Sequence, residues 1–299
     1  MLQFTRRIPI DKGWSGDRKY RVTTTEGKDC LLRIFPPEKS GKVRELFAVT
    51  QRLAEMGLPI CAPVSLEEHT DGTYLLQSWI DGRDAVDIIP QLADEAQYSY
   101  GLDAGRILAK LHTLPAPDGR EDWETRFNRK IDRKIAAYSS CPLKYPRGDA
   151  FIGFIAENRQ LLRSRPQCFQ HGDYHIGNMM VDNCGTLTVI DFERFDFGDP
   201  WEEFNRIVWC AQASPEFACG MVDGYFGGEV PEEFWQLTAL YIASNTLSSL
   251  PWAVPFGQRE IGVMLAQAED VLGWYDGMRS YRPSWYKNHR KRGQHEQHA

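Results

Sequence analysis

The stretch His171-Gly-Asp-Tyr-His-Ile-Gly-Asn178 places the carboxylate of Asp173 five positions before the amide of Asn178. An apolar run further along the chain ends in a second carboxylate, Asp191. The whole region is rich in Gly, Asn and Asp between apolar runs, which predicts loops and a small hairpin. Isolated Asp and Asn residues most often form turns, but the joint spacing of these three favours a functional site.

The spacing fits the chemistry of phosphoryl transfer. Protein kinases place an Asp base five residues before an Asn metal ligand, and a second metal-binding Asp follows in a D-F-G segment. Asp173, Asn178 and Asp191, which is followed by Phe192, stand in this order. Mg²⁺ prefers oxygen ligands and takes one or two carboxylates, while phosphates and water supply the rest. The pattern therefore predicts Asp173 as the catalytic base and Asn178 and Asp191 as ligands of Mg²⁺.

The composition is that of a globular protein. The 299 residues are 42% hydrophobic and 25% charged, and this length favours one large unit or two unequal ones. The seven cysteines are scattered without paired spacing, so we expect reduced thiols. No apolar run approaches the length of a membrane span, and the start lacks the apolar core of a signal peptide, so the expected location is cytoplasmic.

The net charge is −6, which argues against nucleic acid as a partner and leaves a small-molecule substrate, cationic ones included. Basic residues gather only in the last fourteen positions, 286–299, where Gly, Gln and His accompany them. We expect this segment to be a solvated basic tail rather than a binding site.

The first eighty residues predict an antiparallel sheet that carries one helix. Strand-like runs cover Lys19–Thr25 and Asp29–Phe35, and a second pair covers Val64–Glu68 and Thr73–Trp79, each pair joined by a turn that contains Gly. Between the pairs, apolar residues recur at helical spacing from Gly41 onward. The fold class is therefore α+β.

Beyond this sheet the pattern is mainly helical. We expect a nucleotide-binding lobe over 1–80, a hinge or linker over 81–97, and a larger lobe over 98–285 that contains the catalytic loop and the substrate site. Near its middle, Gly198-Asp-Pro-Trp-Glu202 reads as a helix start. Asp199 would be the N-cap and Glu202 its capping partner.

The two motifs resemble those of the aminoglycoside phosphotransferase and choline kinase families. In these families H-G-D-x-H-x-G-N and I-D-F/W-E are the signature, and both stand here at His171–Asn178 and Ile190–Glu193. The resemblance implies a bilobal protein-kinase-like fold, and it assigns the two histidines of the first motif to ordering the loop. It also implies a Lys or Arg on the third strand that binds the nucleotide phosphates, paired with a Glu on the following helix.

Arg33 and Glu45 occupy the positions of that pair. An Arg is always charged and grips phosphate oxygens in a bidentate manner, which suits the role. The alternatives are a solubilising edge-strand residue and an exposed helix charge.

The remaining nucleotide contacts are also implied by the resemblance. The backbone groups of Ser78 and Ile80 would meet the base of ATP or GTP. Gly13, Ser15 and Gly16 would cover the phosphates, although this segment lacks the full G-x-G-x-x-G spacing and a plain β-turn is an equal alternative.

The sequence thus predicts an ATP- or GTP-dependent transfer of the γ-phosphoryl group to a hydroxyl of a small molecule. An aminoglycoside or related antibiotic is the first expectation for the acceptor, followed by choline, homoserine or an amino sugar. A protein kinase is disfavoured because Gly172 replaces the Arg of the catalytic loop and no A-P-E segment follows. A non-catalytic nucleotide-binding module would be expected to lack one of Arg33, Asp173, Asn178 or Asp191.

Acidic residues of the larger lobe offer a candidate surface for a polycationic antibiotic. The alternative is a set of solvated helix surfaces, which is the usual role of such residues. The residues concerned are Glu202, Glu203, Asp223, Glu229, Glu232, Glu233, Glu260 and Asp270.

Overall fold

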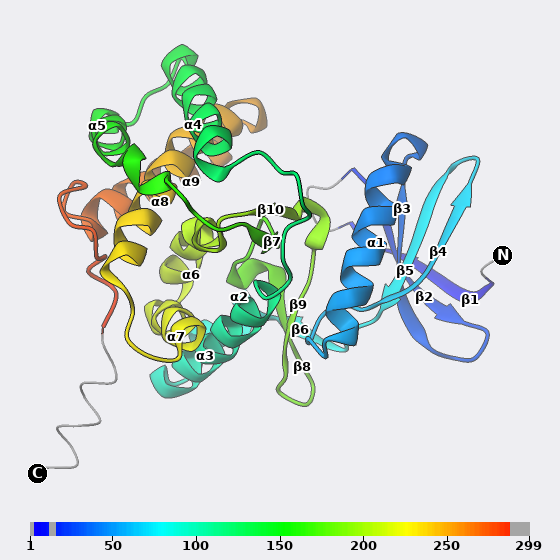
Figure 1. The fold of residues 1–299 in the computed structure, drawn as a ribbon. Helices are drawn as coiled ribbons and strands as arrows, with labels where there is room; N and C mark the ends of the chain where they lie inside the picture. The colour runs from blue at the N-terminus through cyan, green and yellow to red at the C-terminus, as the bar shows by residue number, and fades with distance from the viewer. Residues whose placement is uncertain (1–2, 12–15, 288–299) are drawn as a thin grey trace, which may run out of the picture. The chain divides into compact units, whose positions relative to one another are not determined.

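The computed structural model describes residues 3–11 and 16–287. The chain divides into two compact units (Figure 1). The first unit contains the residues up to Ile88 together with Gly177–Phe195, and the second contains Ile89–Ile176 and the residues from Asp196 onward. The chain therefore passes from one unit to the other inside the motif quoted above. The segment 177–195 belongs to the first unit and not, as its place in the sequence suggested, to the larger lobe.

The main sheet of the first unit is antiparallel, with strand order β1-β2-β3-β5-β4 among the described residues. Both predicted hairpins and the predicted helix α1 are present, because alternating apolar residues and glycine turns mark them clearly. Strand β1 was not predicted, since four of its six residues are exposed and give no alternating signal. The bounds are β1 Phe4–Pro9, β2 Arg18–Thr24, β3 Asp29–Phe35, α1 Ser40–Glu55, β4 Pro63–His69 and β5 Gly72–Ser78.

A second, smaller sheet of this unit has the order β6-β8-β9. It consists of β6 (Gly82–Asp84), β8 (Met179–Asp182) and β9 (Leu187–Val189), and the short helix α2 (Ala85–Ile88) follows β6. The β8–β9 pair is the hairpin that the composition of this region predicted. It joins the segment 177–195 to the remainder of the unit, since Val189 donates its N–H to the carbonyl of Pro59.

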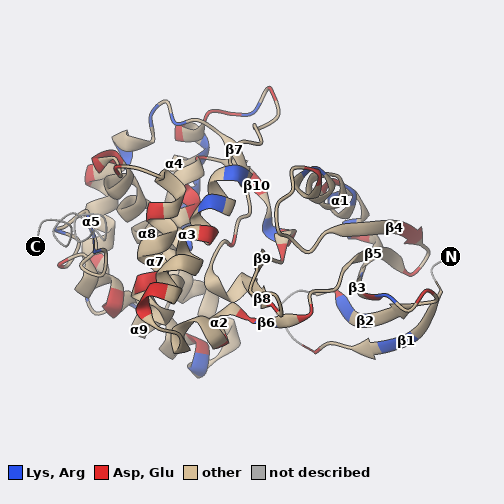
Figure 2. Ribbon diagram, turned by 90° about the horizontal axis from the view of Figure 1, so that it is seen from below, with Lys and Arg blue, Asp and Glu red and all other residues tan. Residues whose placement is uncertain are grey.

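The second unit is mainly helical, as predicted, and a two-stranded sheet of β7 and β10 lies within it. Lys and Arg are interspersed with Asp and Glu over its helices (Figure 2). No helix in the described part of the chain is both long and apolar enough to span a membrane. The bounds are α3 Asp94–Leu111, α4 Trp123–Ser140, α5 Gly148–Asn158, β7 Cys168–Gln170, β10 Asp196–Gly198, the 3₁₀ helix η6 Pro200–Arg206, α6 Ile207–Ala213, α7 Pro215–Phe226, α8 Glu232–Ala253 and α9 Gln258–Trp274.

Helices α3 and α7 are in direct backbone contact through four glycines. Gly101 and Gly105 of α3 face Gly220 and Gly224 of α7, each pair separated by one helical turn. A Cβ atom added to Gly105 would lie only 2.2 Å from the carbonyl oxygen of Met221. The absence of side chains therefore sets the distance between the two helices.

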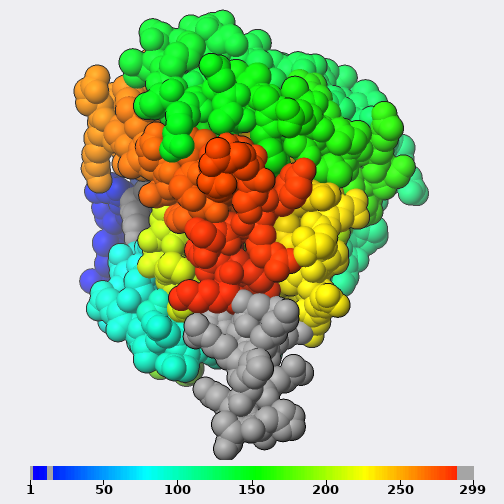
Figure 3. Space-filling view, turned by 90° about the vertical axis from the view of Figure 1, so that its left-hand side faces the viewer, coloured from blue at the N-terminus to red at the C-terminus, as the bar shows by residue number. Residues whose placement is uncertain are grey.

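The C-terminal part of the described chain packs on the surface of the second unit (Figure 3). Tyr286 donates its hydroxyl to Asp223, and Lys287 pairs with Glu216 at 3.0 Å. These two positions belong to the segment 286–299 that we expected to be a solvated tail, so the first two residues of that segment are ordered against α7. Residues 288–299 lie outside the described residues.

We predict that Gly105→Ala destabilises the protein by about 1–3 kcal/mol or more, because the added methyl group meets rigid backbone atoms of α7. Gly262→Ala is the matched control. A Cβ atom added to Gly262, inside α9, would meet nothing within 4 Å among the described residues beyond its own stretch of helix, so that substitution should stabilise by about 0.5–1 kcal/mol. Denaturant unfolding measures both, and equal effects of the two substitutions would contradict the close α3–α7 contact.

Candidate active site

Asp173 lies in the second unit, in the loop that follows β7. Its side chain is 19% exposed, and its carboxylate oxygen Oδ1 is 3.1 Å from Nε of Arg206 and 3.7 Å from Nε2 of His175. Its backbone N–H donates to Nδ1 of His171, which is fully buried. The carboxylate is thus held in a defined orientation while part of it stays accessible. The contact of His171 with the backbone fits the loop-ordering role that the resemblance implied.

Glu203, a buried residue outside the motif, anchors this loop. Oε1 of Glu203 accepts the N–H of Gly172 at 2.9 Å, and the residue is only 1% exposed. Burial and the neighbouring Glu202 raise the pKa of Glu203 to about 8, while backbone N–H groups of Gly172, His171 and Tyr174 act in the opposite direction. Tyr174, also fully buried, donates its hydroxyl to the carbonyl of Ala104 on α3.

The 3₁₀ helix η6 carries Glu203 and Arg206 and is itself fixed by Asp199. The carboxylate of Asp199 caps η6 by accepting the N–H of Trp201 at 2.9 Å, as predicted for an N-cap. It also pairs with Arg165 at 2.6 Å and accepts the hydroxyl of Tyr241 at 2.6 Å. A buried network therefore determines where the residues around Asp173 lie.

Glu202 differs from its predicted role. Its carboxylate oxygens meet Nζ of Lys130 at 3.0 Å and Nε2 of Gln170 at 3.1 Å instead of closing a capping box. Burial opposes ionisation of Glu202, but the charges of Lys130, Lys134 and Arg206 hold its pKa below the usual value. This carboxylate is therefore occupied by cations of its own unit.

Arg33 lies in the first unit, on β3, and is bound by three carboxylates. Its Nε is 2.6 Å from Asp17, its Nη1 3.3 Å from Asp191 and its Nη2 2.7 Å from Glu193. Burial alone would lower the pKa of this guanidinium, but the hydrogen bond to Asp17 and the charges of all three carboxylates raise it. Arg33 thereby links its own strand β3 to the segment before β2 and to the segment after β9.

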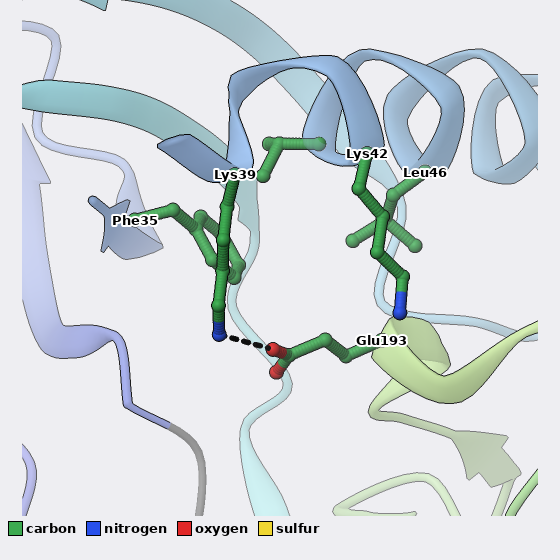
Figure 4. Close-up of a pocket in the computed structure, with 6 residues that line it drawn as sticks. Phe35, Lys39, Lys42, Leu46 and Glu193 are labelled. Atoms are coloured by element: carbon green, nitrogen blue, oxygen red, sulfur yellow. Dashed lines mark hydrogen bonds and ion pairs between the residues drawn. The ribbon is translucent and has the colours of Figure 1, made fainter. Parts of the chain in front are cut away.

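The structure does not bring Arg33 and Glu45 together. Glu45 is exposed, and Glu193 takes the place beside Arg33 that the resemblance implied for a helix carboxylate. The N-terminal end of α1 presents cations instead: Lys39 pairs with Glu193 at 3.4 Å, and Lys42 points the same way into a small pocket (Figure 4). The physical reason is helix phase, since the buried stripe of α1 contains Leu46 and not its neighbour Glu45.

Asn178 and Asp191 lie at the same end of the β8–β9 hairpin. Met179 pairs with Val189 across the hairpin, and Ile190 donates its N–H to the carbonyl of Asn178 at 3.0 Å. Asp191 follows at once with a left-handed backbone, φ 64°, which is rare outside glycine and turns up at functional sites. An amide oxygen and a carboxylate at the same end of one hairpin fit Mg²⁺, which leaves its other positions to phosphates and water.

No cluster of three or more His, Cys, Asp or Glu side chains suited to a metal exists in the part of the chain that the structure describes. A site that relies on its substrate for most ligands would not need one.

The other predicted nucleotide contacts are placed as follows. Ser78 donates its N–H to the carbonyl of Ala62, whereas no backbone hydrogen bond of Ile80 is found within the described residues. Gly16 is exposed and directly precedes Asp17, the partner of Arg33. Gly13 and Ser15 lie outside the described residues.

A family model for a phosphotransferase enzyme family matches residues 7–235. The chain belongs to this phosphotransferase enzyme family. An aminoglycoside 3'-phosphotransferase of Niallia circulans is 23% identical over 208 residues, which cover 66% of this chain and 75% of the relative. The chain is accordingly a small-molecule kinase, as predicted.

Solved structures of similar proteins share the fold. A choline/ethanolamine kinase family protein from Mesorhizobium loti matches with a TM-score of 0.66 at 16% identity, covering 93% of this chain and 92% of its own. The aminoglycoside phosphotransferase APH(4)-Ia, in a ternary complex with ADP and hygromycin B, matches with a TM-score of 0.63 at 15% identity, covering 90% and 94%. The predicted protein-kinase-like fold is confirmed.

Three residues around the site were not assigned a role there from the sequence: Glu203, which was grouped only with the acidic surface residues, Arg206 and Lys134. The start of η6 at Asp199 was predicted, and Glu203 and Arg206 lie three residues, one turn of a 3₁₀ helix, apart. That regularity could have directed attention to Glu203 and Arg206. Nothing in the sequence pairs them with a loop about thirty residues earlier.

We predict that Arg33→Met destabilises the protein by about 3–5 kcal/mol, because it leaves Asp17, Asp191 and Glu193 without their shared cation. Glu45→Gln should change the free energy of unfolding by less than about 0.5 kcal/mol, as expected for an exposed residue. Denaturant unfolding compares the two. A loss in Glu45→Gln as large as that in Arg33→Met would instead show that Arg33 and Glu45 form the pair.

We predict that Glu203 makes stability fall as pH rises from about 5 to 8. A carboxyl group whose pKa is raised on folding binds more protons in the folded state over this range, so its contribution is full at low pH and is lost as pH rises. Glu203→Gln replaces the titrating carboxyl group with a neutral amide. It should flatten the slope of stability against pH by up to about 1.4 kcal/mol per pH unit. Thermal unfolding at several pH values measures the slope, and parallel curves for the two proteins would contradict the prediction.

Proposed function

We propose that the protein transfers the γ-phosphoryl group of ATP or GTP, with Mg²⁺, to a hydroxyl group of a small molecule. The observation that carries this proposal is the setting of Asp173, a partly exposed carboxylate on a loop fixed by buried hydrogen bonds. A rigid base of this kind is what a positioning mechanism requires.

Asp173 accepts a hydrogen bond from the acceptor hydroxyl and aligns its oxygen for attack on the γ-phosphorus. The new P–O bond forms as the bond from the γ-phosphorus to the β,γ-bridging oxygen breaks, and the hydroxyl proton passes to Asp173. Arg206 and His175 both lie against Oδ1 of the carboxylate and orient it for this step. They are positioning residues for the base.

The first unit supplies the groups for the nucleotide. Asn178 and Asp191 would hold Mg²⁺, which neutralises charge on the β- and γ-phosphates when it is bound. Arg33 is the candidate phosphate cation, and its contact with Asp191 is the longest of its three, at 3.3 Å. Ile80, with Ser78 beside it, would offer backbone groups to the base, and Gly13, Ser15 and Gly16 would cover the phosphates.

The comparisons support a nucleotide as donor, since solved relatives were obtained with ADP or AMP-PNP. The alternative of a non-catalytic nucleotide-binding module is disfavoured because Arg33, Asp173, Asn178 and Asp191 are all retained. The curated relative and several structural neighbours support an aminoglycoside as the first acceptor to test, and choline, homoserine and amino sugars remain the other candidates.

We predict that Asp173→Ala lowers kcat by about 10²–10⁴ while the affinity for the Mg²⁺–nucleotide stays within a few-fold, because Asp173 acts on the acceptor. Phosphotransfer is measured with ATP and GTP against aminoglycosides, choline, amino sugars and hydroxy acids, and nucleotide binding by titration calorimetry. Asp132→Asn, an exposed change on α4, is the control and should leave turnover unaltered. Near-normal turnover by Asp173→Ala would refute the assignment of the base.

A further inference from the structure

Three cations of the second unit lie on or beside the helix η6, and one of them contacts Asp173. Arg206 contacts the carboxylate of Asp173 directly, at 3.1 Å. Lys130 reaches the same helix η6 from α4 through its 3.0 Å pair with Glu202. Lys134 follows Lys130 by four residues on α4, so the two side chains project from the same face of the helix. Positive charges on η6 itself and on α4 therefore lie close together.

Lys134 differs from the other two cations in its lack of a counterion within the described part of the chain. Lys130 is paired with Glu202 and Arg206 with Asp173, but the ammonium group of Lys134 makes no hydrogen bond or ion pair with any described residue. Its charge interacts unfavourably with those of Lys130 and Arg206 and favourably with Glu202. Burial of Lys134 and these repulsions lower its pKa to about 7. The side chain of Lys134 is half-buried, and an anion bound beside it would offset these repulsions.

The carboxylates that could have formed a surface for a polycation are engaged elsewhere. Glu203 binds the backbone of the catalytic loop, and Glu202 is neutralised by Lys130. Further pairs occupy Asp223 with Tyr98 and Tyr286, Glu232 with Arg282, Glu233 with Arg165, and Asp270 with Gln212. Six of the eight acidic residues therefore have partners within the second unit, and Glu232 and Glu233 are exposed, as expected for a solvated helix surface.

We propose that the acceptor carries a negatively charged group, a carboxylate or a phosphate ester, and that Lys134 with Arg206 binds this group while Asp173 receives the hydroxyl. The inference rests on the proposed phosphotransfer and specifies the charge of its acceptor. It reverses the expectation of a cationic substrate. A bound anion supplies the counterion that Lys134 lacks among the described residues, and the fixed position of Arg206 directs the acceptor toward Asp173.

The test uses matched acceptors that differ in one charged group. D-glycerate is compared with glycerol, D-gluconate with D-glucitol, and D-fructose 6-phosphate with D-fructose, while kanamycin and choline represent cations. Phosphotransfer from Mg²⁺–ATP gives kcat and KM for each, and calorimetry gives the binding constant independently of turnover. We expect the charged member of at least one pair to have a kcat/KM or a binding constant at least tenfold more favourable than its neutral partner.

Lys134→Met keeps most of the length of the side chain and removes its charge. It should lower kcat/KM for the charged acceptor by about 10-fold or more, mainly through KM, because the anion loses its partner before the chemical step. Its effect on a neutral acceptor should be within about 2-fold. Arg133→Met, an exposed change at the neighbouring position of α4, is the matched control and should alter neither acceptor.

The possible outcomes separate this inference from the proposed function. A preference for kanamycin or choline, or equal use of charged and neutral partners, would overturn the inference while the phosphotransferase assignment stands. The same holds if nucleotide is hydrolysed but no charged acceptor binds or reacts. If neither hydrolysis nor transfer depends on Asp173, the proposed function itself fails.

Discussion

The hydrogen bonds from the catalytic loop to the buried carboxylate of Glu203 are the constraint on which the candidate site depends. A loop rich in glycine would otherwise leave its backbone N–H groups to water, and its carboxylate would sample many positions. Glu203 accepts those N–H groups, Tyr174 fixes the loop to α3, and Asp199 fixes the helix that carries Glu203. Buried polar residues, each held by a partner, thus give Asp173 one orientation.

The same principle explains the arrangement of charges. In the first unit one guanidinium, Arg33, joins three carboxylates that come from separate segments. In the second unit most acidic side chains serve as partners of local cations or hydroxyls, whereas the ammonium group of Lys134 has no partner among the described residues. Under the proposed binding of an anion, the net charge of −6 counted along the sequence does not represent the charge that the acceptor meets.

Local signals predicted the parts of the fold that they determine. Alternation and glycine turns located β2, β3, β4 and β5, and helical spacing located α1. The spacing of Asp173, Asn178 and Asp191 indicated phosphoryl transfer, because it matches the order of the base and the metal ligands in kinases. Contacts between distant positions were not predictable, such as that of Glu203 with Gly172. The phase of α1 was predictable, because Glu45 precedes a buried leucine and cannot share its face.

The central claim, that Asp173 acts as a base in a direct transfer, is tested most directly by the stereochemistry at phosphorus. ATP made chiral at the γ-phosphorus with oxygen isotopes and sulfur is used with the best acceptor of the panel, and the configuration of the product is determined. A direct in-line attack predicts inversion of configuration. Retention would contradict the account, because it would mean that a side chain is first phosphorylated and the acceptor attacks only in a second step.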